Sequence, residues 1–167
     1  LAEQELLSNL SVLKDSELLY ERGIYHQSTY VFKHALTQNV AYDSLLLKRR
    51  KEIHEKIGAV IEALYPDRLE EYNELLAYHY GRSVNADKAV MYLDLANQKA
   101  AKLNAMDEAK AYFDEAMELL DALPETEENR RRRISMLVNQ GIVIMLLFKS
   151  SEYYKFLTRY EPMARDL

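Results

Sequence analysis

The chain has 167 residues, 49% hydrophobic and 29% charged, which is enough to bury a core as one domain or two small ones. The absence of Cys excludes disulfides and Cys-ligated zinc, and a net charge of −5 gives no overall attraction to nucleic acid or anionic lipid. Only 4 Gly and 3 Pro favour a mainly helical chain, in which 13 Tyr suit helix–helix contacts that have one wet edge.

The first residues predict a helix followed by a β-hairpin. Leucines recur at helical spacing across Ala2–Lys14, which indicates a short amphipathic helix. Aromatic and β-branched residues then favour two strands, at Glu17–Tyr25 and Ser28–Lys33, joined by a turn at Tyr25–Ser28. A helix followed by a two-stranded wing is the back half of a winged-helix domain.

Two longer helices are expected next, over Ala35–Leu46 and Lys48–Leu64, because each segment places its apolar residues on one face. Pro66 follows the second helix and is placed to open another. We therefore predict a partial winged-helix domain with a small β-hairpin wing over residues 1–66, followed only by helices.

Residues 67–167 contain an internal repeat. Two runs of small and large apolar residues share the same steps of 4, 3, 4 and 3 along the chain. The runs are Ala89, Leu93, Ala96, Ala100, Leu103 and Ala109, Phe113, Ala116, Leu120, Leu123. Small residues at these spacings predict helices that approach one another closely.

A wider echo relates Ala77, Ala89, Leu93 and Ala96 to Gly141, Tyr153, Leu157 and Tyr160. This order of small, small, large and small residues is typical of tetratricopeptide repeats, whose helix pairs stack into a solenoid. Tyr153 and Tyr160 stand where small residues are expected. The predicted fold is therefore mainly α, with the partial winged helix leading into tetratricopeptide-like helical repeats over residues 67–167.

No residue pattern indicates catalysis or metal binding. The four histidines are His26, His34, His54 and His79, and none has a recurrent metal-ligand spacing to another His or to a carboxylate. A Gly-rich phosphate loop is absent from the sequence. We therefore expect no enzyme activity, no metal and no cofactor in this chain by itself.

Two basic runs, Lys48–Lys51 and Arg130–Arg133, raise the question of DNA binding. Four consecutive helical residues point all around a helix, and acids flank both runs. The helix before the wing, which reads the groove in winged-helix proteins, carries Glu3 and Glu5 against a lone Lys14. We favour solvated or interdomain faces, and keep a DNA-binding winged-helix transcription regulator with a helical sensor domain as the alternative.

A family resemblance rests on the segment FKHALTQNVAYDSLLLKRRKEIHEKIG from Phe32, followed by ELLAYHYGRS and KAVMYLDLANQKA. Its motif is F-x-H-A-L-x-x-x-V-A-Y-x-S-L-L. Residues 17–123 resemble the region after the ATPase core of STAND-type signalling ATPases, especially those attached to bacterial adenylate/guanylate cyclases. In that family a winged helix and tetratricopeptide repeats follow the nucleotide-binding core. The resemblance implies a cytoplasmic signalling protein, with ATP or ADP bound by the parent rather than by this fragment.

The resemblance also implies a role for His34. Related ATPases carry a His at the end of the wing, in an MHD motif, that senses the phosphate of bound nucleotide. His34 stands at the corresponding strand-to-helix junction, with Lys33 and Ala35 in place of the Met and Asp of that motif. The local interpretation of His34 is a helix cap or a packed junction residue.

We interpret the chain as a non-catalytic regulatory and protein-interaction fragment of a longer signalling ATPase or nucleotide cyclase, since it begins without Met and ends within a helical pattern. Binding of a protein or peptide partner, or of the ATPase core itself, would shift a resting-to-active equilibrium. Helical phase gives Tyr80, Asn97, Tyr112 and Asn139 as groove residues.

The sequence also bears on a second copy of the chain, on nucleic acid and on membrane as partners. Exposed leucines near the N-terminus, Leu6, Leu7 and Leu10, would allow a homodimer. Nucleic acid and membrane are not expected, because the charge is negative and the longest apolar run, Ile142–Phe148, is too short to span a bilayer.

Overall fold

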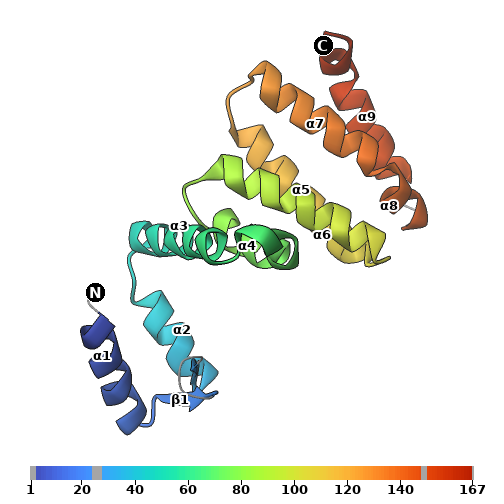
Figure 1. Cartoon of the computed structure of the whole chain (residues 1–167). Helices are drawn as coiled ribbons and strands as arrows, with labels where there is room; N and C mark the ends of the chain where they lie inside the picture. The colour runs from blue at the N-terminus through green and yellow to red at the C-terminus, as the bar shows by residue number, and fades with distance from the viewer. Residues whose placement is uncertain (1–2, 24–27, 148–149, 167) are drawn as a thin grey trace. The chain divides into compact units, whose positions relative to one another are not determined.

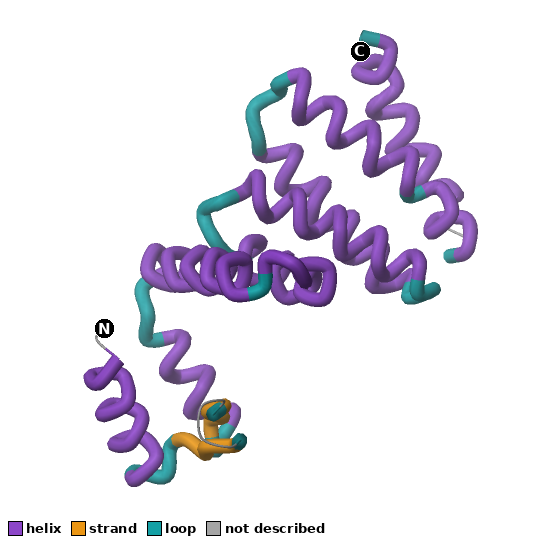
Figure 2. The backbone as a smooth tube through the Cα atoms, in the orientation of Figure 1, coloured by secondary structure: helices purple, strands orange, loops and turns teal. Residues whose placement is uncertain are grey.

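The computed structural model describes residues 3–23, 28–147 and 150–166 (Figures 1 and 2). It is mainly helical, with a two-stranded antiparallel hairpin followed by an array of helices, which confirms the predicted fold class. The chain divides into two compact units, Leu1–Arg50 and Lys51–Leu167. Each unit is described by itself.

The first unit contains α1 (Glu3–Asp15), β1 (Leu19–Arg22), β2 (Thr29–Phe32) and α2 (Ala35–Asp43). The two strands pair antiparallel, from Leu19 opposite Phe32 to Arg22 opposite Thr29. Both are shorter than predicted. His26 and most of the predicted Tyr25–Ser28 turn lie outside the described residues.

Polar contacts carry much of the packing in this first unit. Leu19 is buried, whereas Leu6 and Leu7 of α1 are about half exposed. The Lys14 ammonium lies 2.7 Å from the Glu21 carboxylate, which joins the end of α1 to the hairpin, and Lys33 pairs with Glu17 at 2.6 Å. Exposed ion pairs of this kind contribute little to stability, and the exposure of Leu6 and Leu7 indicates that the apolar core of this unit is small.

The second unit starts within α3 (Leu47–Leu64) and continues through the 3-10 helix η1 (Pro66–Tyr72), α4 (Asn73–Gly81) and α5 (Ala86–Lys102). It ends with four helices: α6 (Met106–Ala122), α7 (Glu127–Asn139), α8 (Gly141–Leu146) and α9 (Ser150–Arg165). Helix α5 packs between α4 and α6, and α7 packs beside α9 (Figure 1).

The unit boundary lies earlier than the predicted boundary after Pro66, because most of α3 belongs with the helical array. Ile61 joins the main apolar core, and Gly58 lies directly under the ring of Tyr80. These contacts place the inner face of α3 against α4. Residue 50, rather than the proline, therefore ends the first unit.

The repeat positions form the core of the array. In both runs the first four positions are buried, and the large members Leu93 and Phe113 are 1% exposed. The alanines at the repeat positions of α5 allow this helix to pack closely against its neighbours. The fifth position of this run is not buried, since Leu103, which follows the end of α5, is 69% exposed.

The two tyrosines that depart from the repeat pattern use their hydroxyl groups. Tyr153 donates to the carbonyl of Leu137 at 2.9 Å, and Tyr160 donates to the Asp121 carboxylate at 2.8 Å. A Cβ on Gly141 would lie 3.3 Å from the Tyr153 hydroxyl. The lack of a side chain at Gly141 therefore leaves room for the large side chain of Tyr153.

The arginines of the run at the start of α7 point in several directions. Arg131 pairs with Glu127 at 2.7 Å, and Arg132 pairs with both Asp87 and Glu128. Arg133 is 4% exposed and donates to the Leu120 carbonyl. Internal carboxylates and a carbonyl group therefore bind much of this positive charge.

We predict that Gly58→Ala destabilises the second unit by about 1–3 kcal/mol, because the new Cβ would lie 2.7 Å from the buried Tyr80 ring. The measurement is urea unfolding followed by circular dichroism. Gly81→Ala is the matched control, since its Cβ would meet only the flexible end of Glu115. Equal stability of Gly58→Ala and wild type would contradict the packing described.

Candidate functional site

His34, the residue proposed as a phosphate sensor, occupies the N-cap position of α2. Its backbone carbonyl accepts from the Thr37 amide at 3.0 Å, while its side chain makes no capping hydrogen bond. The side chain is exposed. The backbone of His34 therefore starts the helix, and the imidazole is accessible.

The four groove residues expected from helical phase do not share one surface. Tyr80 and Asn97 lie in the interior, with 1% and 3% exposure, where a partner cannot reach them. Tyr112 is partly buried, and Asn139 is exposed at the end of α7. Helical phase identifies one side of a helix but not which neighbour covers that side.

Asn97 instead belongs to a buried polar network. Its amide donates to the Ala109 carbonyl at 2.6 Å and to the Gln140 side-chain oxygen at 2.9 Å. Gln140 is fully buried at the end of α7. The network therefore joins α5, α6 and α7.

A second polar cluster surrounds the carboxylate of Glu62. It accepts hydrogen bonds from the hydroxyls of Tyr80 and Tyr92, each at 2.7 Å, and from the ammonium of Lys88 at 2.5 Å. Burial by itself raises the pKa of Glu62, but these hydrogen bonds outweigh it and hold the pKa below its usual value. A carboxylate with three donors is a poor base at neutral pH, so we interpret the cluster as a link between α3, α4 and α5.

His54 and His79 form a pair that the sequence did not indicate, since 25 residues separate them. Their Nδ1 atoms lie 3.0 Å apart, which requires one to donate and the other to accept. Burial lowers the pKa of both residues, and the positive charge of Arg82 lowers each further. Within the described ranges, no group of three or more His, Cys, Asp or Glu is arranged to hold a metal ion.

A groove of about 680 Å³ lies between α5 and α7 and is here called the α5/α7 groove. Its residues are Asp87, Lys88, Val90, Met91, Asp94, Leu95, Arg131, Arg132, Ser135 and Met136. Both helices supply apolar and charged side chains. The groove thus combines apolar surface with charge.

Asp94 has a different environment from the other charged residues of the α5/α7 groove. Its Oδ2 atom accepts from the Gln98 amide at 3.0 Å, while none of the described residues donates a hydrogen bond to the buried Oδ1 atom. Burial raises the pKa of the Asp94 carboxyl, and the hydrogen bond from Gln98 offsets only part of this effect. The carboxylate is therefore incompletely compensated.

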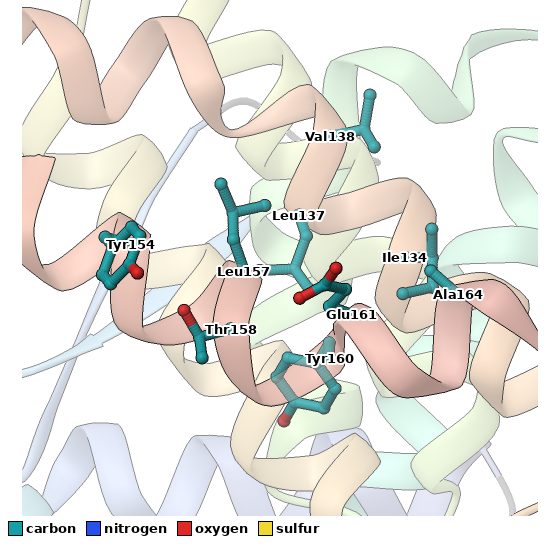
Figure 3. A pocket seen from close by; sticks show the side chains of 9 residues that line it. All are labelled: Ile134, Leu137, Val138, Tyr154, Leu157, Thr158, Tyr160, Glu161 and Ala164. Atoms are coloured by element: carbon teal, nitrogen blue, oxygen red, sulfur yellow. The ribbon is translucent and has the colours of Figure 1, made fainter.

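A smaller groove of about 410 Å³ lies between α7 and α9 (Figure 3). Ile134, Leu137 and Val138 line it from α7, and Tyr154 and Leu157 line it from α9. Val138 is 67% exposed. The polar side chains of this groove, Tyr154, Thr158, Tyr160 and Glu161, all come from α9, whereas both helices supply charged groups to the α5/α7 groove.

Comparison with known proteins gives one distant relative. The chain is 22% identical over 119 residues, or 71% of its length, to a protein of Rhizobium meliloti (strain 1021) described as uncharacterized. The chain covers 12% of that protein's length. No family model and no solved structure matches the chain.

None of the helices in the described part of the chain is long and apolar enough to cross a membrane.

The His54–His79 pair predicts a loss of stability in acid. Because the folded-state pKa of each residue is lower than the unfolded value near 6.5, the unfolded chain binds protons that the folded chain does not. This stability is present above pH 6.5 and is lost as the pH falls through the folded-state pKa. The melting temperature of the wild type should fall between pH 7.5 and pH 5.5.

The fall should be smaller in His79→Gln, which keeps a neutral partner for His54. His34→Gln, an exposed position in the other unit, is the matched control and should retain the wild-type pH dependence. The measurement is thermal unfolding of all three proteins at both pH values. Identical pH dependence in wild type and His79→Gln would show that the pair does not titrate as described.

Proposed function

We propose that this chain is a non-catalytic protein-interaction module that binds a peptide segment of a partner in the α5/α7 groove. The observation that carries the proposal is the groove itself, with a volume of about 680 Å³ and both apolar and charged walls. Such a volume falls in the usual range for ligand sites, about 300–1,000 Å³. Apolar side chains would supply binding free energy, and the charged residues would fix the orientation of the peptide.

Ion pairs connect the walls of this groove to each other and to α3, which supports a binding surface that is formed before the partner binds. Lys88 lines the groove and also binds Glu62 of α3. Arg132 lines the opposite wall and pairs with Asp87 at 2.8 Å. Preformed walls lower the entropy lost on binding.

As the resemblance to STAND-type ATPases implies, we also propose that binding regulates an ATPase core in a longer cytoplasmic protein. A ligand shifts such an equilibrium only as far as it binds the two states with different affinity. The exposed imidazole of His34 is available to contact a nucleotide phosphate from such a core. The DNA-binding alternative has less support, because Arg131, Arg132 and Arg133 are engaged within the chain.

Removal of apolar side chains from the α5/α7 groove should weaken peptide binding. Peptides selected from a random phage-displayed library on the 167-residue chain should lose about tenfold in affinity for the double variant Met91→Ala, Leu95→Ala, because two exposed apolar contacts are removed. Binding is measured by fluorescence anisotropy with labelled synthetic peptides. Leu103→Ala, an exposed leucine at the end of α5 outside the groove, should bind as the wild type does.

Removal of the His34 imidazole should weaken the response to the bound nucleotide. In the longer protein that contains this chain, His34→Ala should reduce the difference between the ATP-bound and ADP-bound states, because a direct phosphate contact is lost. Limited proteolysis with each nucleotide measures that difference. His79→Gln is the control, since its imidazole pairs with His54 rather than facing solvent. Unchanged nucleotide dependence in His34→Ala would exclude the sensor role.

A further inference from the structure

We infer that the segment bound in the α5/α7 groove presents a Lys or Arg side chain whose cationic group pairs with Asp94, with apolar side chains on either side of it. This inference rests on the proposed function and specifies the partner's chemistry at that site.

Charged side chains line both walls of the α5/α7 groove. Three of its basic residues already have carboxylate partners within the chain: Lys88 lies 2.5 Å from Glu62, Arg131 lies 2.7 Å from Glu127, and Arg132 lies 2.8 Å from Asp87. The last of these pairs also compensates Asp87. Asp94 is the exception, since in the described part of the chain it has no ion pair, and the Gln98 amide is its donor.

The carboxylate of Asp94 lies in a partly buried environment. Its Oδ1 atom is buried, and no residue in the described ranges donates a hydrogen bond to it. Asp94 is partly buried, and an ionised carboxylate that is partly withdrawn from water without a cation is less stable than one fully in water. A neutral N–H donor would not compensate this negative charge. An ammonium or guanidinium group that approaches the carboxylate from the groove would, and its hydrogen bonds to a carboxylate are about twice as strong as neutral ones.

Apolar side chains line the groove next to Asp94. Met91 lies one helical turn before Asp94, and Leu95 follows it directly. Both residues line the groove and are exposed, and Met136 faces them from α7. The methylene stem of Lys or Arg packs well on such a surface while its charged end reaches a carboxylate. Methionine adapts to apolar side chains of different shapes. The expected recognition element is therefore a basic residue flanked by apolar residues.

The test combines peptide selection with a double-mutant cycle. Peptides selected on the immobilised 167-residue chain should be enriched in Lys or Arg next to apolar residues. Asp94→Asn keeps an oxygen that accepts from Gln98 but removes the charge, and it should weaken binding of these peptides at least tenfold. Replacing the basic residue of the peptide by Met should weaken binding by a similar factor, with little further loss on Asp94→Asn.

Two controls accompany the cycle. Asp87→Asn also removes a carboxylate from the groove, but one already paired with Arg132, and it should change affinity less than Asp94→Asn does. Thermal unfolding of Asp94→Asn should give a melting temperature equal to or above that of the wild type, because a partly buried carboxylate without a cationic partner among the described residues is replaced by a neutral amide. The Met-substituted peptide tests the same pair without any change in the protein.

The outcomes separate this inference from the proposed function. If no selected peptide is sensitive to the Met91→Ala, Leu95→Ala variant, the groove is not the binding surface and both proposals fail. If peptides depend on Met91 and Leu95 but lack basic residues, or bind Asp94→Asn as tightly as wild type, the groove binds peptides and the role of Asp94 is overturned. A coupling between Asp94 and the basic residue supports both.

Discussion

The carboxylate of Glu62 is the contact on which the geometry of the array depends most. It binds Tyr80 of α4 and both Tyr92 and Lys88 of α5, so one side chain of α3 sets the spacing of three helices. The stacked rings of Tyr80 and Tyr92, with centroids 5.5 Å apart, pack beside it. Because Lys88 also lines the α5/α7 groove, a contact on the far side of α5 positions one wall of the candidate site.

Polar contacts also set the position of α7 relative to α5. Gln140 and Asn97 hydrogen-bond in the interior, and Arg132 and Asp87 pair nearer the surface. Buried polar groups of this kind lose free energy when their partners shift, so they specify one arrangement more strongly than apolar contacts do. The width of the groove is therefore set by these polar contacts together with the packing of Val90 and Met136 in the main apolar core.

Local patterns predicted the helices, the hairpin and the buried stripes of the repeat, because each depends on spacing within one segment. The candidate site depends on contacts between segments and was not predicted. Asn97 looks like a surface residue on its own helix, yet α6 and α7 supply its partners. Asp94 looks like an ordinary solvated acid between two leucines. None of the described residues supplies a cation to its carboxylate, which no local spacing reveals.

The exchange of sizes between Gly141 and Tyr153 has a consequence for how this architecture diverges. A larger residue at position 141 requires the Tyr153 ring to shift or position 153 to become smaller, so the two positions are expected to covary among homologous chains. Such paired changes keep the helices in place while they erase the residue pattern that defines a repeat. An α-hairpin array can in this way retain its backbone long after its consensus sequence has been lost.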